Sequence, residues 1–172
     1  RKIVDKYRED TFDVIENHPE WLAEIPGISR KKAADIATSF AEQAEVRSIM
    51  MLCGGHLNSG AVGRVYQKFG KSAVAIVKAD PYKLCDQGLG IGFEAADTLA
   101  MSLGVGKDFD TRIRSGIIYV LEQSAQMGGH VCMPKDRLIG AVTARLEIEE
   151  DKVRDALADS LELGTVVEYM HE

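Results

Sequence analysis

An internal repeat constrains the fold of this chain more than any other feature of its sequence. Residues 3–22 align with residues 65–84, and the match continues beyond them after one inserted residue. The matched positions are Lys6 with Lys68, Tyr7 with Phe69, Pro19 with Pro81, Leu22 with Leu84, Ala33 with Ala96, and Ile36 with Leu99. Residues 56–70 look like a further, divergent half of the same unit. We therefore expect repeated small units, the first of them truncated because it starts at its second helix.

The chain reads as helical almost throughout. Apolar residues recur every three or four positions, which is the spacing of a helix with one buried face. The segments with this spacing are Arg30–Leu52, Gly92–Leu103, Thr111–Met127, Pro134–Leu146 and Glu149–Leu163. Only two short stretches read as strands, His130–Met133 and the β-branched, aromatic stretch Thr165–Met170. Glycine and proline residues separate the segments and predict the turns between them.

Residues 25–37 (IPGISRKKAADIA) form the motif with the clearest physical purpose. Gly27 permits a positive φ that other residues resist, so the chain can turn sharply between two helices. Ser29 can cap the second helix, and the small Ala33 lets the two helices pack closely. The free N–H groups at the start of that helix suit an anion such as a DNA phosphate. The expected phosphate contacts are Pro26, Gly27, Ile28, Ser29, Arg30, Lys31 and Lys32.

This pattern is that of a helix-hairpin-helix motif. We expect a mainly α fold, with tandem helix-hairpin-helix units followed by a small winged-helix-like module that has one short β-hairpin. We expect the tandem units to form a DNA-binding domain over residues 1–109 and the winged-helix-like module to cover residues 110–172. The last helix of that module carries mainly acidic side chains, which suit a major groove poorly. We therefore interpret the module as a packing or docking element.

The other units have different chemistry around their turns. In the second copy, Glu94 and Asp97 follow the glycine turn with no base near them in the sequence, so we expect a structural role there. Four residues of the middle unit could contact DNA, although a solvated helix face would explain them equally well. These candidate DNA contacts are Asn58, Ser59, Arg64 and Lys68.

Aromatic and cysteine residues are expected to be structural. Trp21, Phe12, Tyr7 and Phe69 recur on the apolar faces of the repeat, which predicts that they lie in the core. A base-stacking role would require them to be exposed beside basic residues. The cysteines Cys53, Cys85 and Cys132 are far apart and lack the spacing of a zinc site or of a disulfide framework. We expect reduced, mostly buried thiols, and no metal site.

Charge and motif content limit the function. The net charge is −6, from 27 acidic and 21 basic residues, which argues against a strong stand-alone DNA binder and allows a local basic patch. Gly70-Lys71-Ser72 resembles the end of a phosphate-binding loop, but Val65 stands where that loop needs glycine. No nucleophile–base pair or carboxylate pair stands out. We expect a cytoplasmic, non-catalytic fragment with no signal peptide and no membrane partner.

The ordered series of motifs resembles the N-terminal helix-hairpin-helix region of the longer RecD-like ATP-dependent DNA helicases, the family of the exodeoxyribonuclease V α-subunit. The resemblance is carried by KYREDTFDVIENHPEWLAEIPGISRKKA, YKLCDQGLGIGFEAAD and RIRSGIIYVLEQSAQMGGHVCMPKDRL. It implies an accessory region of a 5′-to-3′ helicase in DNA repair or recombination. The motor, which uses ATP and magnesium, is absent from these residues, and no cofactor is expected in this fragment.

Two functions remain open from the sequence. The first is weak, salt-sensitive and sequence-independent binding of single-stranded or forked DNA, in partnership with the helicase motor domains of the same chain. The alternative is a protein-interaction scaffold of a DNA-processing enzyme, without direct DNA contact. The salt dependence of DNA binding separates the two, because phosphate contacts release counterions.

Overall fold

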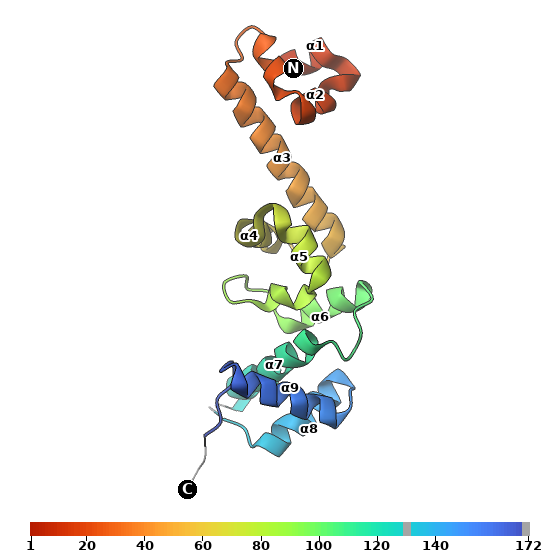
Figure 1. Ribbon diagram of the computed structural model, residues 1–172, viewed down its shortest axis with the longest axis vertical. Coiled ribbons are helices and arrows are strands. Elements are labelled where there is room, and N and C mark those ends of the chain that lie inside the picture. Colours follow the sequence, from red (N-terminus) through yellow and green to blue (C-terminus); the bar gives the residue numbers. More distant parts are fainter. Residues whose placement is uncertain (129–131, 170–172) are drawn as a thin grey trace. The chain divides into compact units, whose positions relative to one another are not determined.

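The computed structural model describes residues 1–128 and 132–169, and these residues are mainly helical (Figure 1). The chain divides into two compact units, Arg1–Leu52 and Cys53–Glu172. The boundary expected between residues 109 and 110 stays a prediction, and it falls inside the second unit. In the described ranges, no helix is both long enough and apolar enough to cross a membrane.

The first unit is a cluster of short helices followed by one long helix. It contains α1 (Lys2–Tyr7), η1 (Arg8–Asp10), α2 (Thr11–Asn17), η2 (Pro19–Glu24) and α3 (Arg30–Cys53), where η marks a 3₁₀ helix. Its core consists of Val14, Ile15, Leu22, Ile25 and Ala33. Leu22 is fully buried, so η2 is anchored directly before the glycine turn.

The second unit begins with the same series of elements. They are α4 (Ser59–Phe69), η3 (Gly70–Ser72), α5 (Ala73–Ala79), η4 (Pro81–Cys85) and α6 (Phe93–Ser102). The repeat predicted from the sequence is therefore a repeat of structure. Gly70, Lys71 and Ser72 form a 3₁₀ turn directly after a helix, whereas a phosphate-binding loop follows a strand.

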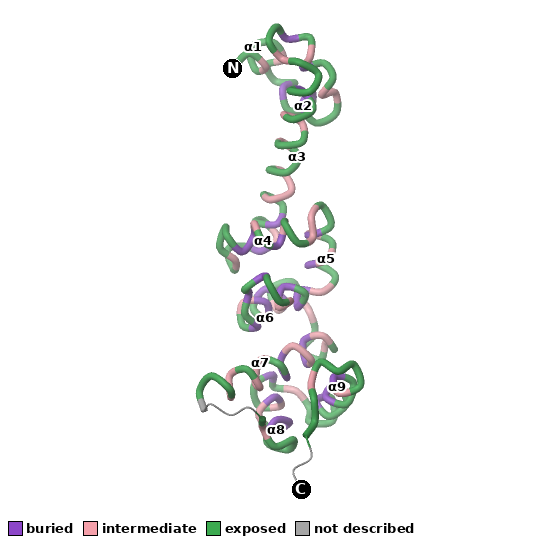
Figure 2. The backbone as a smooth tube through the Cα atoms, turned by 90° about the vertical axis from the view of Figure 1, so that its left-hand side faces the viewer, coloured by how far each residue is buried: buried purple, intermediate pink, exposed green. Residues whose placement is uncertain are grey.

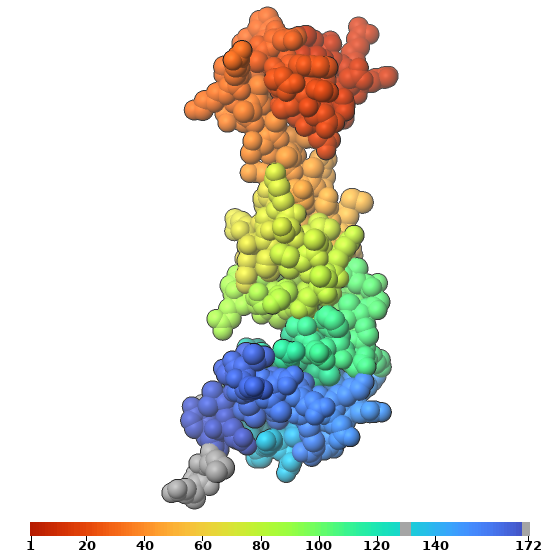
Figure 3. Space-filling model, in the orientation of Figure 1, coloured from red at the N-terminus to blue at the C-terminus, as the bar shows by residue number. Residues whose placement is uncertain are grey.

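Three further helices complete the second unit, α7 (Asp110–Gly128), α8 (Lys135–Leu146) and α9 (Glu150–Glu162). They pack against one another, and Figure 3 shows them as a close-packed block at the blue end of the colour scale. α7 also contacts α6 and η4, so the second copy of the repeat and these helices share one packed interior. Figure 2 marks the buried residues of this unit in purple.

The predicted β-hairpin is not found among the described residues. The strand expected at Thr165–Met170 is wrong over residues 165–169, which form no strand. The N–H groups of Thr165 and Val166 instead donate to the carbonyl of Ser160, at 3.0 and 3.2 Å, and close the C-terminal end of α9. Of the strand expected at His130–Met133, the first two residues lie outside the described ranges, and Cys132 and Met133 are not in a strand. The winged-helix-like description of this module is therefore not supported.

The cysteines differ in their exposure. Cys53 is buried and Cys85 partly buried, whereas Cys132 is exposed, so the expectation of mostly buried thiols is wrong for Cys132. Burial raises the pKa of the Cys53 thiol. Burial, reinforced by nearby carboxylates, raises the pKa of Cys85 to about 12. Both thiols stay protonated at neutral pH and are poor nucleophiles.

Candidate nucleic-acid interface

The turn between η2 and α3 has the geometry that the sequence predicted. Gly27 has a φ of 92°, a region that other residues rarely adopt. The Ile28 N–H donates to the carbonyl of Ile25 at 3.0 Å and tightens the turn. The Ser29 hydroxyl accepts from the Lys32 N–H at 3.2 Å, which is the predicted cap of α3. Ala33 is buried against the turn, as its small size predicted.

The start of α3 leaves donors for an anion. The Ala33 N–H bonds to the carbonyl of Ser29, while the N–H groups of Ser29, Arg30 and Lys31 have no partner in the described ranges. Unpaired N–H groups at a helix start carry partial positive charge. Arg30, Lys31 and Lys32 are exposed, and none of them forms an ion pair with another described residue. The remaining predicted contacts follow the same pattern, since Pro26, Gly27 and Ser29 are exposed and Ile28 is half-buried.

A lysine of α1 stabilises this turn through a hydrogen bond to its backbone. The Lys2 ammonium donates to the carbonyl of Pro26 at 3.1 Å. One turn further along α1, Lys6 pairs with Glu24 at 3.0 Å and lies over the ring of Tyr7. Two basic side chains of α1 are therefore used inside the unit and do not reach toward a ligand.

The second copy has the same arrangement, in which Arg64 and Lys68 take the places of Lys2 and Lys6. Arg64 Nε donates to the carbonyl of Leu89 at 2.6 Å, directly before the turn glycine Gly90. Lys68 pairs with Asp86 at 3.1 Å and lies over the ring of Phe69. The structure thus places Arg64 and Lys68 against the second turn. The equal spacing of basic residues in the two copies was the sequence signal that could have identified this role.

The two other candidates of the middle unit lie at the start of α4. The Asn58 side chain accepts from the Ala61 N–H at 2.8 Å and caps the helix. Ser59 is the first residue of α4 and is exposed. These residues and those of the first turn belong to different compact units, so each group is a separate candidate surface.

The second hairpin is exposed at its turn, but side chains of its second helix contact the C-terminal helices. Its turn contains Gly88 and Gly90, with φ of 88° and 60°. Glu94, in the first turn of α6, accepts from the Tyr119 hydroxyl at 2.7 Å and also pairs with Arg145. The Phe93 ring stacks on that of Tyr119, with ring centroids 5.1 Å apart. Side chains in the first turn of α6 therefore contact α7 and α8, which agrees with a structural role.

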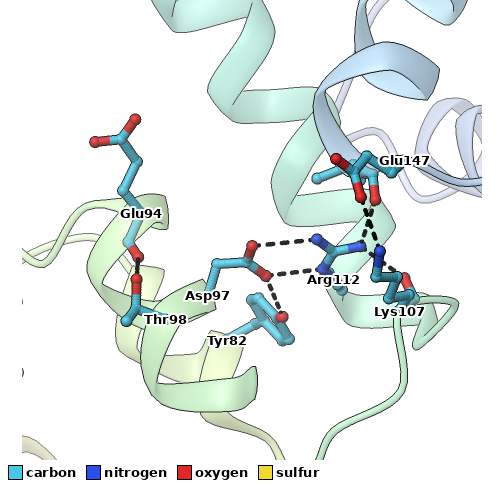
Figure 4. A network of polar contacts seen from close by, with 8 residues as sticks. Tyr82, Glu94, Asp97, Thr98, Lys107, Arg112 and Glu147 are labelled. Atoms are coloured by element: carbon cyan, nitrogen blue, oxygen red, sulfur yellow. Dashed lines mark hydrogen bonds and ion pairs between the residues drawn. The ribbon is translucent and has the colours of Figure 1, made fainter. Parts of the chain in front are cut away.

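Asp97 is the centre of a polar network that the sequence did not reveal (Figure 4). Arg112 donates to both of its carboxylate oxygens, at 2.8 and 3.2 Å, and the Tyr82 hydroxyl donates to one of them at 2.6 Å. Arg112 also donates to the carbonyls of Lys107 and Leu146. No base lies near Glu94 or Asp97 in the sequence, but helix packing brings Arg112 to Asp97 and Arg145 to Glu94.

The network sets the ionisation of its members. Burial alone would raise the pKa of Asp97, but hydrogen bonds from Arg112 and Tyr82 outweigh burial and hold that pKa below its usual range. Burial and the hydrogen bond to Asp97 raise the pKa of Tyr82. Asp97 is therefore a fixed, neutralised charge at neutral pH, and it does not repel DNA as a free carboxylate would.

Two aromatic residues that were expected in the core are exposed. Phe12 is 66% and Trp21 43% exposed, while Tyr7 and Phe69 are half-buried. Leu22, next to Trp21, takes the core position, because a short 3₁₀ helix directs neighbouring side chains to different sides. In the described ranges, no three His, Cys, Asp or Glu side chains gather as metal ligands would.

Two helical repeats with glycine turns, each turn bonded to a cation from the first helix of its repeat, define a tandem helix-hairpin-helix region. Residues 41–132 match the family model of the HHH domain of the ATP-dependent RecD2 DNA helicase, and the chain belongs to this family. The chain is also 26% identical, over 168 residues, to the ATP-dependent RecD2 DNA helicase of Deinococcus radiodurans. That alignment covers 97% of this chain and 23% of that helicase, so the chain spans about a quarter of the relative's length.

Proposed function

We propose that this chain is a non-catalytic, sequence-independent DNA-binding region of a RecD-like, ATP-dependent 5′-to-3′ DNA helicase. The observation that carries the proposal is the first turn, where three free N–H groups lie beside exposed Arg30, Lys31 and Lys32. Contacts of this kind hold a phosphate backbone without reading bases. The family match and the helicase relative favour DNA as the bound anion.

In this proposal the two hairpins have different roles. The first turn binds a phosphate of single-stranded or forked DNA, weakly and with strong salt dependence. Asn58 and Ser59 add a second contact at the start of α4. Arg64 and Lys68 act by shaping the second turn, and the second hairpin is architecture. The net charge of −6 is consistent with local contacts of this kind.

The remaining parts of the proposal concern the whole helicase. Its motor, in the same polypeptide, would bind ATP and magnesium and would be the main partner of this region. DNA repair or recombination in the cytoplasm is the setting that such a helicase would serve. If the 172-residue chain hydrolysed ATP by itself, the non-catalytic assignment would be wrong.

A salt titration of binding to oligothymidylate tests the DNA contact. We expect the logarithm of affinity to fall linearly with the logarithm of salt, with a slope of about −0.7 per phosphate. Replacing Arg30, Lys31 and Lys32 by alanine should flatten the slope. A matched control removes three other exposed cations, Lys78, Lys83 and Arg137, and should keep it. No binding at low salt, or equal effects of both triple changes, would favour the protein-interaction scaffold.

A further inference from the structure

His18 and Trp21 form a stacked pair on the surface of the first unit. Their ring centroids are 4.3 Å apart and the ring planes differ by 9°. The Trp21 side chain is nevertheless 43% exposed. One face of the indole is covered by the imidazole, and a large apolar surface remains in contact with water.

The backbone beneath this pair is held in place. The Tyr7 hydroxyl donates to the carbonyl of Trp21 at 2.7 Å, and the Trp21 N–H donates to the carbonyl of His18 at 3.0 Å. The next residue, Leu22, is fully buried. A ligand that stacked on the indole would therefore find the ring already positioned, which lowers the entropic cost of binding.

The pair lies close to the first turn. Tyr7 holds the carbonyl of Trp21, and Lys2 holds the carbonyl of Pro26, from the two ends of the same helix α1. The rise of α1 between Lys2 and Tyr7 is about 7.5 Å. A strand whose phosphate lies at the turn would thus bring an adjacent base within reach of Trp21.

The fold does not require these rings. At the equivalent positions, the second copy has Asp80 in place of His18 and Lys83 in place of Trp21. Asp80 builds the same bend by accepting from the Tyr82 N–H at 3.0 Å, and Lys83 is exposed. The aromatic pair belongs only to the copy whose turn has free cations, which points to a ligand rather than to stability.

The charges around the pair also suit a nucleic acid. Glu24 is paired with Lys6, and Glu20 lies 3.6 Å from the imidazole of His18. Arg30, Lys31 and Lys32 have no such partner among the described residues. Lys6 thus partly offsets the charge of Glu24, while the cations beyond the turn are free to attract phosphates.

We propose that the exposed face of Trp21, backed by His18, stacks on an unpaired base of a strand held at the first turn. The inference rests on the proposed function and makes it specific for single-stranded DNA. Aromatic rings accept any base in this way, because every base has a π-face. The site adds affinity without adding sequence preference.

Trp21 is the only tryptophan of the chain, so its fluorescence reports directly on this site. We expect oligothymidylate to quench the fluorescence of the 172-residue chain, and a blunt duplex to leave it unchanged. Trp21→Ala should weaken oligothymidylate binding about tenfold, because the loss of one base–aromatic stack lowers affinity by a factor of that order. Its salt slope should not change, since no phosphate contact is lost. Trp21→Phe should retain most of the affinity.

Phe12→Ala is the control, because it removes an exposed ring of the same unit that stacks on Phe40. It should leave binding and quenching unchanged. Binding with the full salt slope, no quenching and no effect of Trp21→Ala would overturn the stacking inference and leave the proposed function standing. Equal quenching by the duplex would also overturn it. Absence of binding at every salt concentration would refute both.

Discussion

Arg112 and Asp97 form a two-pronged ion pair that ties α7 to α6, with N–O distances of 2.8 and 3.2 Å. Their side chains are only 6% and 21% exposed. The pair joins the second helix-hairpin-helix copy to the C-terminal helices, so that both belong to one packed unit. It also explains why Asp97 can follow the second turn without leaving an unpaired negative charge there.

Asp97→Asn should destabilise the second unit strongly. The change leaves Arg112 buried without its counter-charge, and the loss of one partner of a buried ion pair costs about 3 kcal/mol or more. Chemical denaturation followed by circular dichroism measures this cost. Lys152→Ala is the control, because it breaks the exposed pair with Asp108 and should leave the midpoint almost unchanged. Equal effects of the two changes would contradict a central role for Arg112 and Asp97.

The same pair predicts how stability depends on pH. Hydrogen bonds from Arg112 and Tyr82 overcome the effect of burial and lower the pKa of Asp97 in the folded state. Its contribution is therefore complete above the unfolded-state value of about 4 and is lost as pH falls through the lower folded-state value. Denaturation midpoints between pH 7 and about 2 should fall more steeply in the parent chain than in Asp97→Asn. Parallel curves would show that Asp97 has an ordinary pKa.

Arg8 has a strained backbone conformation, and the second copy adopts a similar conformation with a glycine. Its φ is 48°, and the equivalent residue of the second copy, Gly70, has a φ of 57°. A side chain in this region costs on the order of 1–3 kcal/mol. Arg8→Gly should therefore stabilise the first unit by about 1 kcal/mol, after the entropy that glycine loses on folding. The reverse change, Gly70→Arg, should destabilise the second unit, and thermal melts of both variants test the pair. A lower midpoint for Arg8→Gly would contradict the predicted strain.

Two helical glycines should respond to alanine in opposite ways. A Cβ at Gly116 would lie 2.8 Å from the side chain of Leu146, which is buried, so Leu146 or the two helices would have to shift. Overpacking of this kind costs about 1–3 kcal/mol. Gly140, in α8, is exposed and has no atom within 4 Å of a new Cβ. Gly140→Ala should stabilise by about 0.5–1 kcal/mol, because alanine favours a helix. Urea denaturation of both variants gives the comparison, and shifts of the same sign would refute it.

Local features of the first turn could be predicted from the sequence. The positive φ of Gly27 and the cap of Ser29 depend on residues within a few positions of each other, so their pattern is visible in a short segment. The same holds for the five helices predicted from apolar spacing, whose bounds lie within one residue of the predicted ones. The strand expected at Thr165–Met170 failed because a strand needs a partner, and Thr165 bonds instead to the end of α9.

The sequence by itself determined the repeat, its turns and the basic residues after the first of them, because these depend on residue type and spacing. The tertiary structure decided which of two neighbouring apolar residues faces solvent. Trp21 is exposed, whereas Leu22 is buried. It also decided which bases neutralise the acids of α6. Arg112 is 15 residues from Asp97, and Arg145 is 51 residues from Glu94. Partners that distant are brought together only by helix packing, and no local pattern encodes the distance between them.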